Sequence, residues 1–144
     1  MMASPESVIT TLLATYVQRL DAGDLAGVAA LFDRAKVFVS GNQIGAGSPF
    51  VEKLLSDTVI LYEDGTPRTR HVLGEPSIQI DDQGRAAASC EYTVTQDGPD
   101  GEYVVMVGRH HDTFVVDDEG DWHFASRDYG DITHVGDTSR HLRS

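Results

Sequence analysis

Apolar residues recur at helical spacing near the start of the chain. Ser4 followed by Pro5 is a typical start signal, with a serine cap and proline at the first helical position. Gly23 then predicts the end of this helix. The apolar positions between these signals come in pairs about every four residues; they are Val8, Ile9, Leu12, Leu13, Tyr16, Val17 and Leu20.

Two further helices are predicted before the middle of the chain. Asp24 caps a short helix over residues 25–32, and residues 37–39 form a short apolar strand. Residues 41–47 contain three glycines and predict a loop. The third helix covers residues 48–59, which open with a second Ser-Pro pair.

The second half of the chain has the pattern of strands. The first extended segment is residues 69–80, with a plausible bulge at Gly74-Glu75-Pro76. Three strands follow, over residues 86–95, 103–116 and 122–132, and Asp- and Gly-rich turns separate them.

This order of elements predicts an α+β fold. Three N-terminal helices pack on the concave face of a curved, cone-like antiparallel sheet. We expect a single domain over residues 1–144, with a core at about 5–132 and a polar, frayed tail at 133–144.

Charge and composition exclude several kinds of partner. The chain has 11 basic and 23 acidic residues, a net charge of −12, which argues against nucleic acid and against an anionic membrane surface. Cys90 is the single cysteine, so an intrachain disulfide is excluded. With neither a secretory signal nor a long apolar segment at its start, the chain is expected to be cytoplasmic.

Asp21 is the first candidate for chemistry. The apolar stripe continues to positions 20 and 21, so an acid occupies a position that the pattern assigns to the interior. It also lies in the last helical turn, where the helix dipole disfavours an anion by about 0.3–1 kcal/mol. Asp21 is therefore either an exposed residue at a fraying helix end or a buried acid that orients a base.

His71 and Arg127 are the second and third candidates. His71 is either an ordinary strand histidine or a general base with a pKa near neutrality. Arg127 is either a salt-bridge partner of one of many carboxylates or a clamp on a developing anion.

The segment Arg109-His110-His111-Asp112 offers one more possibility. On a strand, His110 and Asp112 share one face, and Arg109 and His111 share the other. His71, His110 and Asp112 have the residue types of a metal triad, a weaker reading than that of a metal-free site.

The remaining histidines and the cysteine are assigned structural places. His123, His134 and His141 are expected at solvated positions, and Cys90 in the packed face of a strand.

The chain resembles the SnoaL-like domains of the nuclear transport factor 2-like (NTF2-like) superfamily over roughly residues 5–132. The segments that carry the resemblance are Tyr16–Asp24, Thr69–His71, Val107–Phe114 and Trp122–Arg127. It implies a cystatin-like cone in which a strongly bent sheet wraps the helices and a pocket opens between them.

The resemblance also implies residue roles. In its dehydratase and dehydrochlorinase branch an Asp–His pair abstracts a proton, and Asp21 and His71 fall on those positions. Arg127 falls on the position of a pocket arginine and Tyr16 on a pocket-lining position. His110 stands where the family usually has an aromatic residue, often Tyr, so it adds a second base or hydrogen-bond donor.

We therefore expect a cofactor-free, metal-free lyase or isomerase that acts on a small apolar or ring-sized ligand. Asp21, His71 and Arg127 are the catalytic residues, and Val17 and Met106 join Tyr16 and His110 in the pocket lining; the alternative is a non-catalytic module that binds a ligand or a protein.

A homodimer is also expected. The segment Val104-Val105-Met106-Val107 is apolar on both faces and needs cover on each of them.

Overall fold

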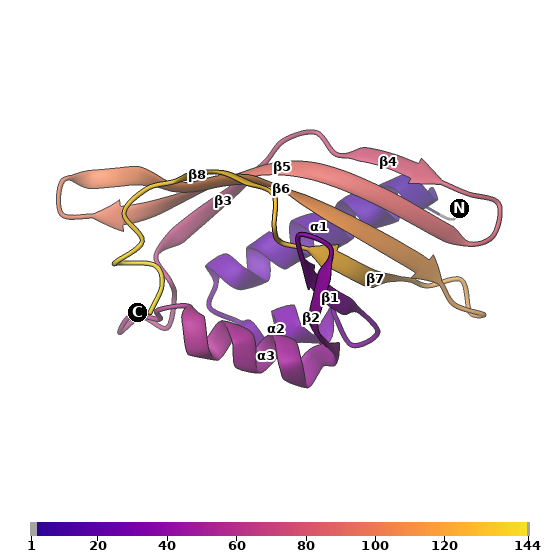
Figure 1. Cartoon of the computed structure of the whole chain (residues 1–144), viewed down its shortest axis with the longest axis horizontal. Helices are drawn as coiled ribbons and strands as arrows, with labels where there is room; N and C mark the ends of the chain where they lie inside the picture. The colour runs from indigo at the N-terminus through magenta and orange to yellow at the C-terminus, as the bar shows by residue number, and fades with distance from the viewer. Residues whose placement is uncertain (1–2, 144) are drawn as a thin grey trace.

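The computed structural model describes residues 3–143 and has three helices on one side of a curved sheet (Figure 1). The helices are α1 (Pro5–Asp21), α2 (Leu25–Ala30) and α3 (Gly47–Thr58). The predicted α+β class and the N-terminal placement of the helices are confirmed.

Eight strands form one unclosed sheet in the order β2-β1-β7-β6-β5-β3, with β4 paired to β5 and β8 to β6. Their bounds are β1 (Lys36–Val39), β2 (Asn42–Ala46), β3 (Thr69–Leu73), β4 (Ser77–Ile80), β5 (Arg85–Gly98), β6 (Gly101–Val116), β7 (Trp122–Asp128) and β8 (Ile132–Val135). The expectation of a purely antiparallel sheet is wrong in one place, because β1 runs parallel to β7.

The helix start signals agree with the structure in two of three cases. Ser4 accepts a hydrogen bond from the backbone N–H of Ser7, and Asp24 accepts one from the N–H of Gly27. The expected cap at Ser48 is wrong: α3 already begins at Gly47, after Ala46, which makes no side-chain cap. The expected loop over residues 41–47 is also wrong, since β2 lies there and leads directly into α3.

The break at residues 74–76 shifts the phase of strand alternation, since Leu73 of β3 and Ile78 of β4 both pack against the core. Instead of one bulged strand, β3 and β4 are separate strands that both pair with β5. His71 lies opposite Val94, which is buried, whereas its neighbour Val72 is exposed. The register therefore points His71 to the inner face of the sheet.

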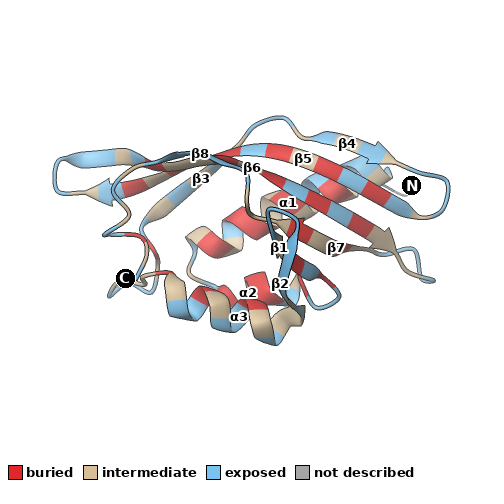
Figure 2. Ribbon diagram, viewed as in Figure 1, coloured by how far each residue is buried: buried red, intermediate tan, exposed pale blue. Residues whose placement is uncertain are grey.

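The core fills the space between the inner face and the helices, and buried positions alternate with exposed ones along β5 and β6 (Figure 2). Side chains from the helices and from the sheet are completely or almost completely buried in this core, among them Ile9, Leu13, Val28, Phe32, Val37, Val51, Phe114 and Phe124. Cys90 packs within this core, as predicted.

The C-terminal residues were expected to fray, but several of them pair with other parts of the fold. The last long strand ends at Asp128, and residues 132–135 pair with β6 as β8. Leu142 forms an antiparallel bridge with Val59, just after α3. No helix among residues 3–143 is both long and apolar enough to span a membrane.

Gly23 follows the end of α1, two residues after Asp21. The N–H of Asp24 donates to Arg19 O, and the N–H of Gly23 donates to Leu20 O, which is the Schellman pattern. Gly23 has a φ of +78°, and a Cβ there would lie 1.9 Å from Gly65 O. The site therefore needs glycine for both conformation and space.

We expect Gly23→Ala to lower the free energy of unfolding by about 2–4 kcal/mol, since it adds overpacking to a strained φ. Gly41→Ala is the matched control: Gly41 has a φ of +83° and nothing within 4 Å of a Cβ, so it should lose only about 1 kcal/mol. Urea unfolding followed by circular dichroism measures both values. Equal losses would contradict the tight contact.

Candidate functional site

Asp21 and His71 form a hydrogen-bonded pair at the end of α1. His71 Nδ1 lies 2.6 Å from Asp21 Oδ1, and the backbone N–H of His71 donates to Asp21 Oδ2 at 2.8 Å. The hydroxyl of Thr69 also donates to Asp21 Oδ1, at 2.9 Å. Three donors from β3 thus hold a single carboxylate.

The fold places this pair through one helix end and one strand face. Asp21 is the last residue of α1, and the alternation of β3 turns Thr69 and His71 to the same side. The His71 side chain is only 6% exposed. Asp21 is accordingly a partly buried acid that orients an imidazole, and not an exposed residue at a fraying end.

The hydrogen bonds keep Asp21 ionised. Burial alone would raise the pKa of its carboxyl, but the bonds and charge from His71, together with Thr69, outweigh burial and lower the pKa below 3.8. Because an ionised carboxylate only accepts hydrogen bonds, His71 Nδ1 carries the proton. In neutral His71 the lone pair is therefore on Nε2, which is the basic nitrogen.

Arg127 is buried on β7 and paired with Asp112 of β6. Its Nε donates to Asp112 Oδ1 at 2.7 Å and its Nη2 to Oδ2 at 2.9 Å. Burial alone would lower the arginine pKa, but the charge of Asp112 outweighs it, so the pKa is raised and the guanidinium stays charged. Nη1 has no hydrogen-bond partner among residues 3–143.

Aromatic rings form the wall around this ion pair. The Arg127 guanidinium carbon lies 4.1 Å from the ring centre of Tyr16, a cation–π contact. The Tyr16 hydroxyl is 3.2 Å from that of Tyr129. His110 stacks on Tyr92 with ring centres 4.2 Å apart, and its edge meets Tyr16 at 5.8 Å.

His110 is a neutral ring in this wall. Burial lowers its pKa well below the ordinary 6.5, and the positive charge of Arg127 lowers it further. His110 and Asp112 share the inner face, as predicted, and His111 lies half-exposed on the other side with Nε2 2.8 Å from Asp131.

The expected site residues therefore fall into two groups. Asp21 contacts His71 directly, whereas within residues 3–143 no hydrogen bond or ion pair joins Arg127 to either of them. Tyr16 and Val17 lie on the buried face of α1, and Met106 accepts a hydrogen bond from the hydroxyl of Tyr92. Of these residues, Tyr16 contacts Arg127 directly.

The geometry does not match the alternative of a metal site at His71, His110 and Asp112. Both carboxylate oxygens of Asp112 accept from Arg127, and no cluster of three or more His, Cys, Asp or Glu in the described part of the chain is placed to hold a metal ion.

Three residues near the two groups were not predicted. Thr69 holds Asp21 and could have been found from its spacing of two from His71 on one strand. Tyr129 completes the wall, and no pattern in the sequence identifies it. The third is His141, which was expected at a solvated position but is buried; the segment that follows β8 folds back and carries it inward.

His123 and His134 have more exposed positions than His141. His134 is exposed as expected, whereas His123 is half-buried and lies 2.7 Å from Asp117. That hydrogen bond is the first cause of the lowered pKa of Asp117, about 2.

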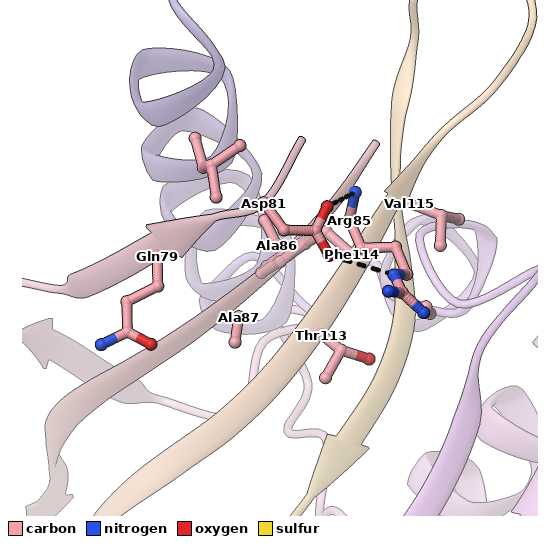
Figure 3. A pocket seen from close by; sticks show the side chains of 10 residues that line it. Gln79, Asp81, Arg85, Ala86, Ala87, Thr113, Phe114 and Val115 are labelled. Atoms are coloured by element: carbon pink, nitrogen blue, oxygen red, sulfur yellow. Dashed lines mark hydrogen bonds and ion pairs between the residues drawn. The ribbon is translucent and has the colours of Figure 1, made fainter. Parts of the chain in front are cut away.

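Of five surface hollows, one borders Thr69, which holds Asp21. The largest, about 600 Å³, is a shallow depression over the sheet (Figure 3). Gln79, Ala87 and Thr113 border it, with the ion pair of Asp81 and Arg85 at one end. None of the five is lined by Asp21 or His71. The open pocket that the resemblance implies is thus not among them.

A comparison with family models identifies the family of the chain. The family described as "SnoaL-like domain" matches residues 3–128. The chain therefore belongs to the SnoaL-like domain family. No curated protein sequence matches it.

Solved structures share this fold at low sequence identity. ActVI-ORFA from Streptomyces coelicolor superposes with a TM-score of 0.70 at 18% identity, covering 91% of this chain and 98% of that one. A scytalone dehydratase-like protein from Novosphingobium aromaticivorans gives 0.69 at 21% identity, covering 91% and 85%. A protein from Catenulispora acidiphila in complex with S-DNPA gives 0.66 at 20% identity, covering 84% and 88%.

We expect His110→Phe to make the protein less sensitive to acid. The lowered pKa means that the unfolded state binds a proton that the folded state does not, so the wild type loses stability as the pH falls below 6.5. A phenyl ring removes this loss, by about 1 kcal/mol or more between pH 6.5 and 5.

Denaturant unfolding at the two pH values measures the difference, with His134→Phe as the exposed control. Equal acid sensitivity of wild type and His110→Phe would contradict a neutral, buried His110.

Proposed function

We propose that this SnoaL-like protein is a cofactor-free lyase or isomerase in which the Asp21–His71 dyad abstracts a proton from a small ring-sized ligand. The observation that carries the proposal is the 2.6 Å contact between His71 Nδ1 and the Asp21 carboxylate, reinforced by the backbone of His71. It leaves Nε2 as a base of fixed orientation.

The dyad suits removal of a proton next to an electron-withdrawing group. His71 Nε2 takes the proton and becomes an imidazolium, which the negative charge of Asp21 stabilises. The electron pair of the broken C–H bond forms an enolate-like anion. In an elimination that pair then expels a leaving group, which takes the proton from His71; in an isomerisation the proton returns to a different carbon.

Arg127 is the proposed electrostatic partner of the developing anion. Its charge is fixed by Asp112, and the unpartnered Nη1 remains as a donor in a buried environment, where charge interactions are strong. Tyr16, Val17, Met106 and His110 supply the apolar and aromatic lining.

The neighbours support a small-molecule ligand without identifying it. One solved relative is scytalone dehydratase-like and another was solved with a small molecule bound. Because the His71 side chain is 6% exposed, we infer that a ligand reaches the dyad only when the packing around it opens.

We expect wild-type protein to accelerate the exchange of α-hydrogens of 1-indanone, a ring ketone, for deuterium in D₂O, followed by NMR. Loss of the base in His71→Gln, or of its orienting acid in Asp21→Asn, should slow the enzymatic rate about 100-fold. His111→Gln is the control, since it disrupts an exposed Asp–His contact on the outer face. Exchange at the buffer rate, or exchange unchanged in His71→Gln, would contradict the proposal.

Two observations favour a non-catalytic ligand-binding or protein-interaction module as the second candidate. None of the five hollows reaches the dyad, and Asp112 occupies two of the nitrogens of Arg127. The same experiment separates the two functions: a module would bind 1-indanone, return it unchanged, and bind it equally well after His71→Ala.

We also propose that two copies associate through the outer face of the sheet. Val72, Thr93 and Val107 lie side by side on β3, β5 and β6, and by alternation they face outward. Val72 is 51% exposed, and nearby Val104 is 41% exposed. An uncharged stripe in a chain of net charge −12 is where a second copy can approach with least repulsion.

Sedimentation velocity at micromolar concentration should accordingly show a dimer. Val72→Glu should shift it to monomer by burying a charge at the contact. Ile44→Glu on β2, also at an exposed apolar residue, should not. A monomeric wild type would refute the dimer.

A further inference from the structure

The C-terminal segment, residues 137–143, packs against the loop that joins α3 to β3. Several bonds attach it to residues 58–62: Ile60 N–H donates to His141 O, Arg143 N–H to Thr58 O, and the hydroxyl of Tyr62 to Arg140 O. Together with the bridge between Val59 and Leu142, these hydrogen bonds fix where His141 lies in the folded structure.

This segment brings His141 to the dyad. The loop between α3 and β3 touches Gly23 on its other side, two residues after Asp21. His141 is 7% exposed, and the charges of His71 and Asp21 both act on it. Burial first, and then the charge of His71, lowers the pKa of His141 to about 4, against the opposing effect of Asp21. His141 is therefore neutral near pH 7.

Two buried polar atoms near the dyad have no partner. His141 Nδ1 makes no hydrogen bond within residues 3–143. Gln96 lies opposite Thr69 on the inner face; its amide nitrogen donates to Pro67 O and Arg68 O, and its Oε1 is unpaired. The two carbonyl acceptors fix the orientation of this amide, so Oε1 is a true acceptor.

Such atoms require an explanation. A buried group without its hydrogen bond destabilises a protein appreciably, and native structures have few of them. These two, one on the residue opposite Thr69 and one on a ring that the charges of His71 and Asp21 reach, are accounted for when a bound molecule supplies the missing partners. Gln96 Oε1 requires a donor, and a neutral imidazole at His141 offers one donor and one acceptor.

We propose that His141 is a ligand-binding residue of the dyad site, where its ring hydrogen-bonds an oxygen of the bound molecule. The proposal rests on the function proposed above, since it takes the dyad as the place where the ligand sits. His141 positions the oxygen-bearing end of the ligand, and His71 acts on its carbon. The ligand class is a ring compound that bears a hydroxyl group, which can also donate to Gln96.

The test compares two probes that differ by one hydroxyl, 5-indanol and indane. Ligand-detected NMR titration of the full chain should show that the wild type binds 5-indanol about fivefold more tightly, the effect of one hydrogen bond. His141→Phe keeps a ring of similar size, removes both nitrogens, and should abolish this preference. His134→Phe, at an exposed histidine of β8, should retain it.

The outcomes separate the two proposals. A preference that is lost in His71→Phe but unchanged in His141→Phe overturns the role of His141 and leaves the dyad as the ligand site. A preference unchanged in both variants, or no binding of either probe to the wild type, overturns the dyad as a ligand site and His141 with it.

A second measurement does not depend on the folding of any variant. Addition of 5-indanol to the wild type should shift the ring resonances of His141 and leave those of His134 in place. Unshifted His141 resonances at saturating 5-indanol overturn the inference.

Discussion

The attachment of Asp21 to β3 is the interaction on which the arrangement of the site depends. A carboxylate at a helix C-terminus opposes the helix dipole at a cost of about 0.3–1 kcal/mol. Three donors from two residues of one strand offset this cost, because a hydrogen bond to a charged group contributes about 1.5–3 kcal/mol. Two of the donors are not the imidazole, so the carboxylate would be held even if the ring turned away. The position of Asp21 therefore does not depend on the ring, and the carboxylate orients the imidazole of His71.

The interior contains two carboxylates with different chemical partners. Asp112 is paired with a guanidinium whose charge is permanent, and both of its oxygens are used. Asp21 is paired with an imidazole, the side chain whose protonation changes most readily near neutral pH. The first pair fixes a positive charge against an aromatic wall, and the second holds an imidazole by one of its ring nitrogens. In the proposed mechanism, this division separates charge stabilisation from acid–base chemistry within one small core.

The sequence predicted the elements more completely than the contacts. The period of α1 placed Asp21 inside, and the dyad of Asp21 and His71 is adjacent in space. The break at residues 74–76 left the facing of His71 open, because periodicity cannot decide whether a break shifts the register; pairing of β3 with β5 decided it. The partner of Arg127 could not be chosen among 23 acidic residues, since the choice depends on the register of β6 against β7. β2 was missed because glycines in a hairpin resemble those in a loop.

His141 lies beyond the reach of local patterns for a different reason. Its neighbours in the sequence are mostly polar, so no local pattern predicts burial. The segment that carries it is attached to residues 58–62, about eighty positions earlier in the chain. It also lies outside residues 3–128, which match the shared SnoaL-like domain. Asp21, His71 and β3 lie within the matched residues, whereas His141 lies in the segment that follows them. On the two proposals above, proton transfer and ligand recognition depend on separate parts of the chain, so a change in the last residues should alter recognition of the ligand oxygen without moving Asp21 or His71.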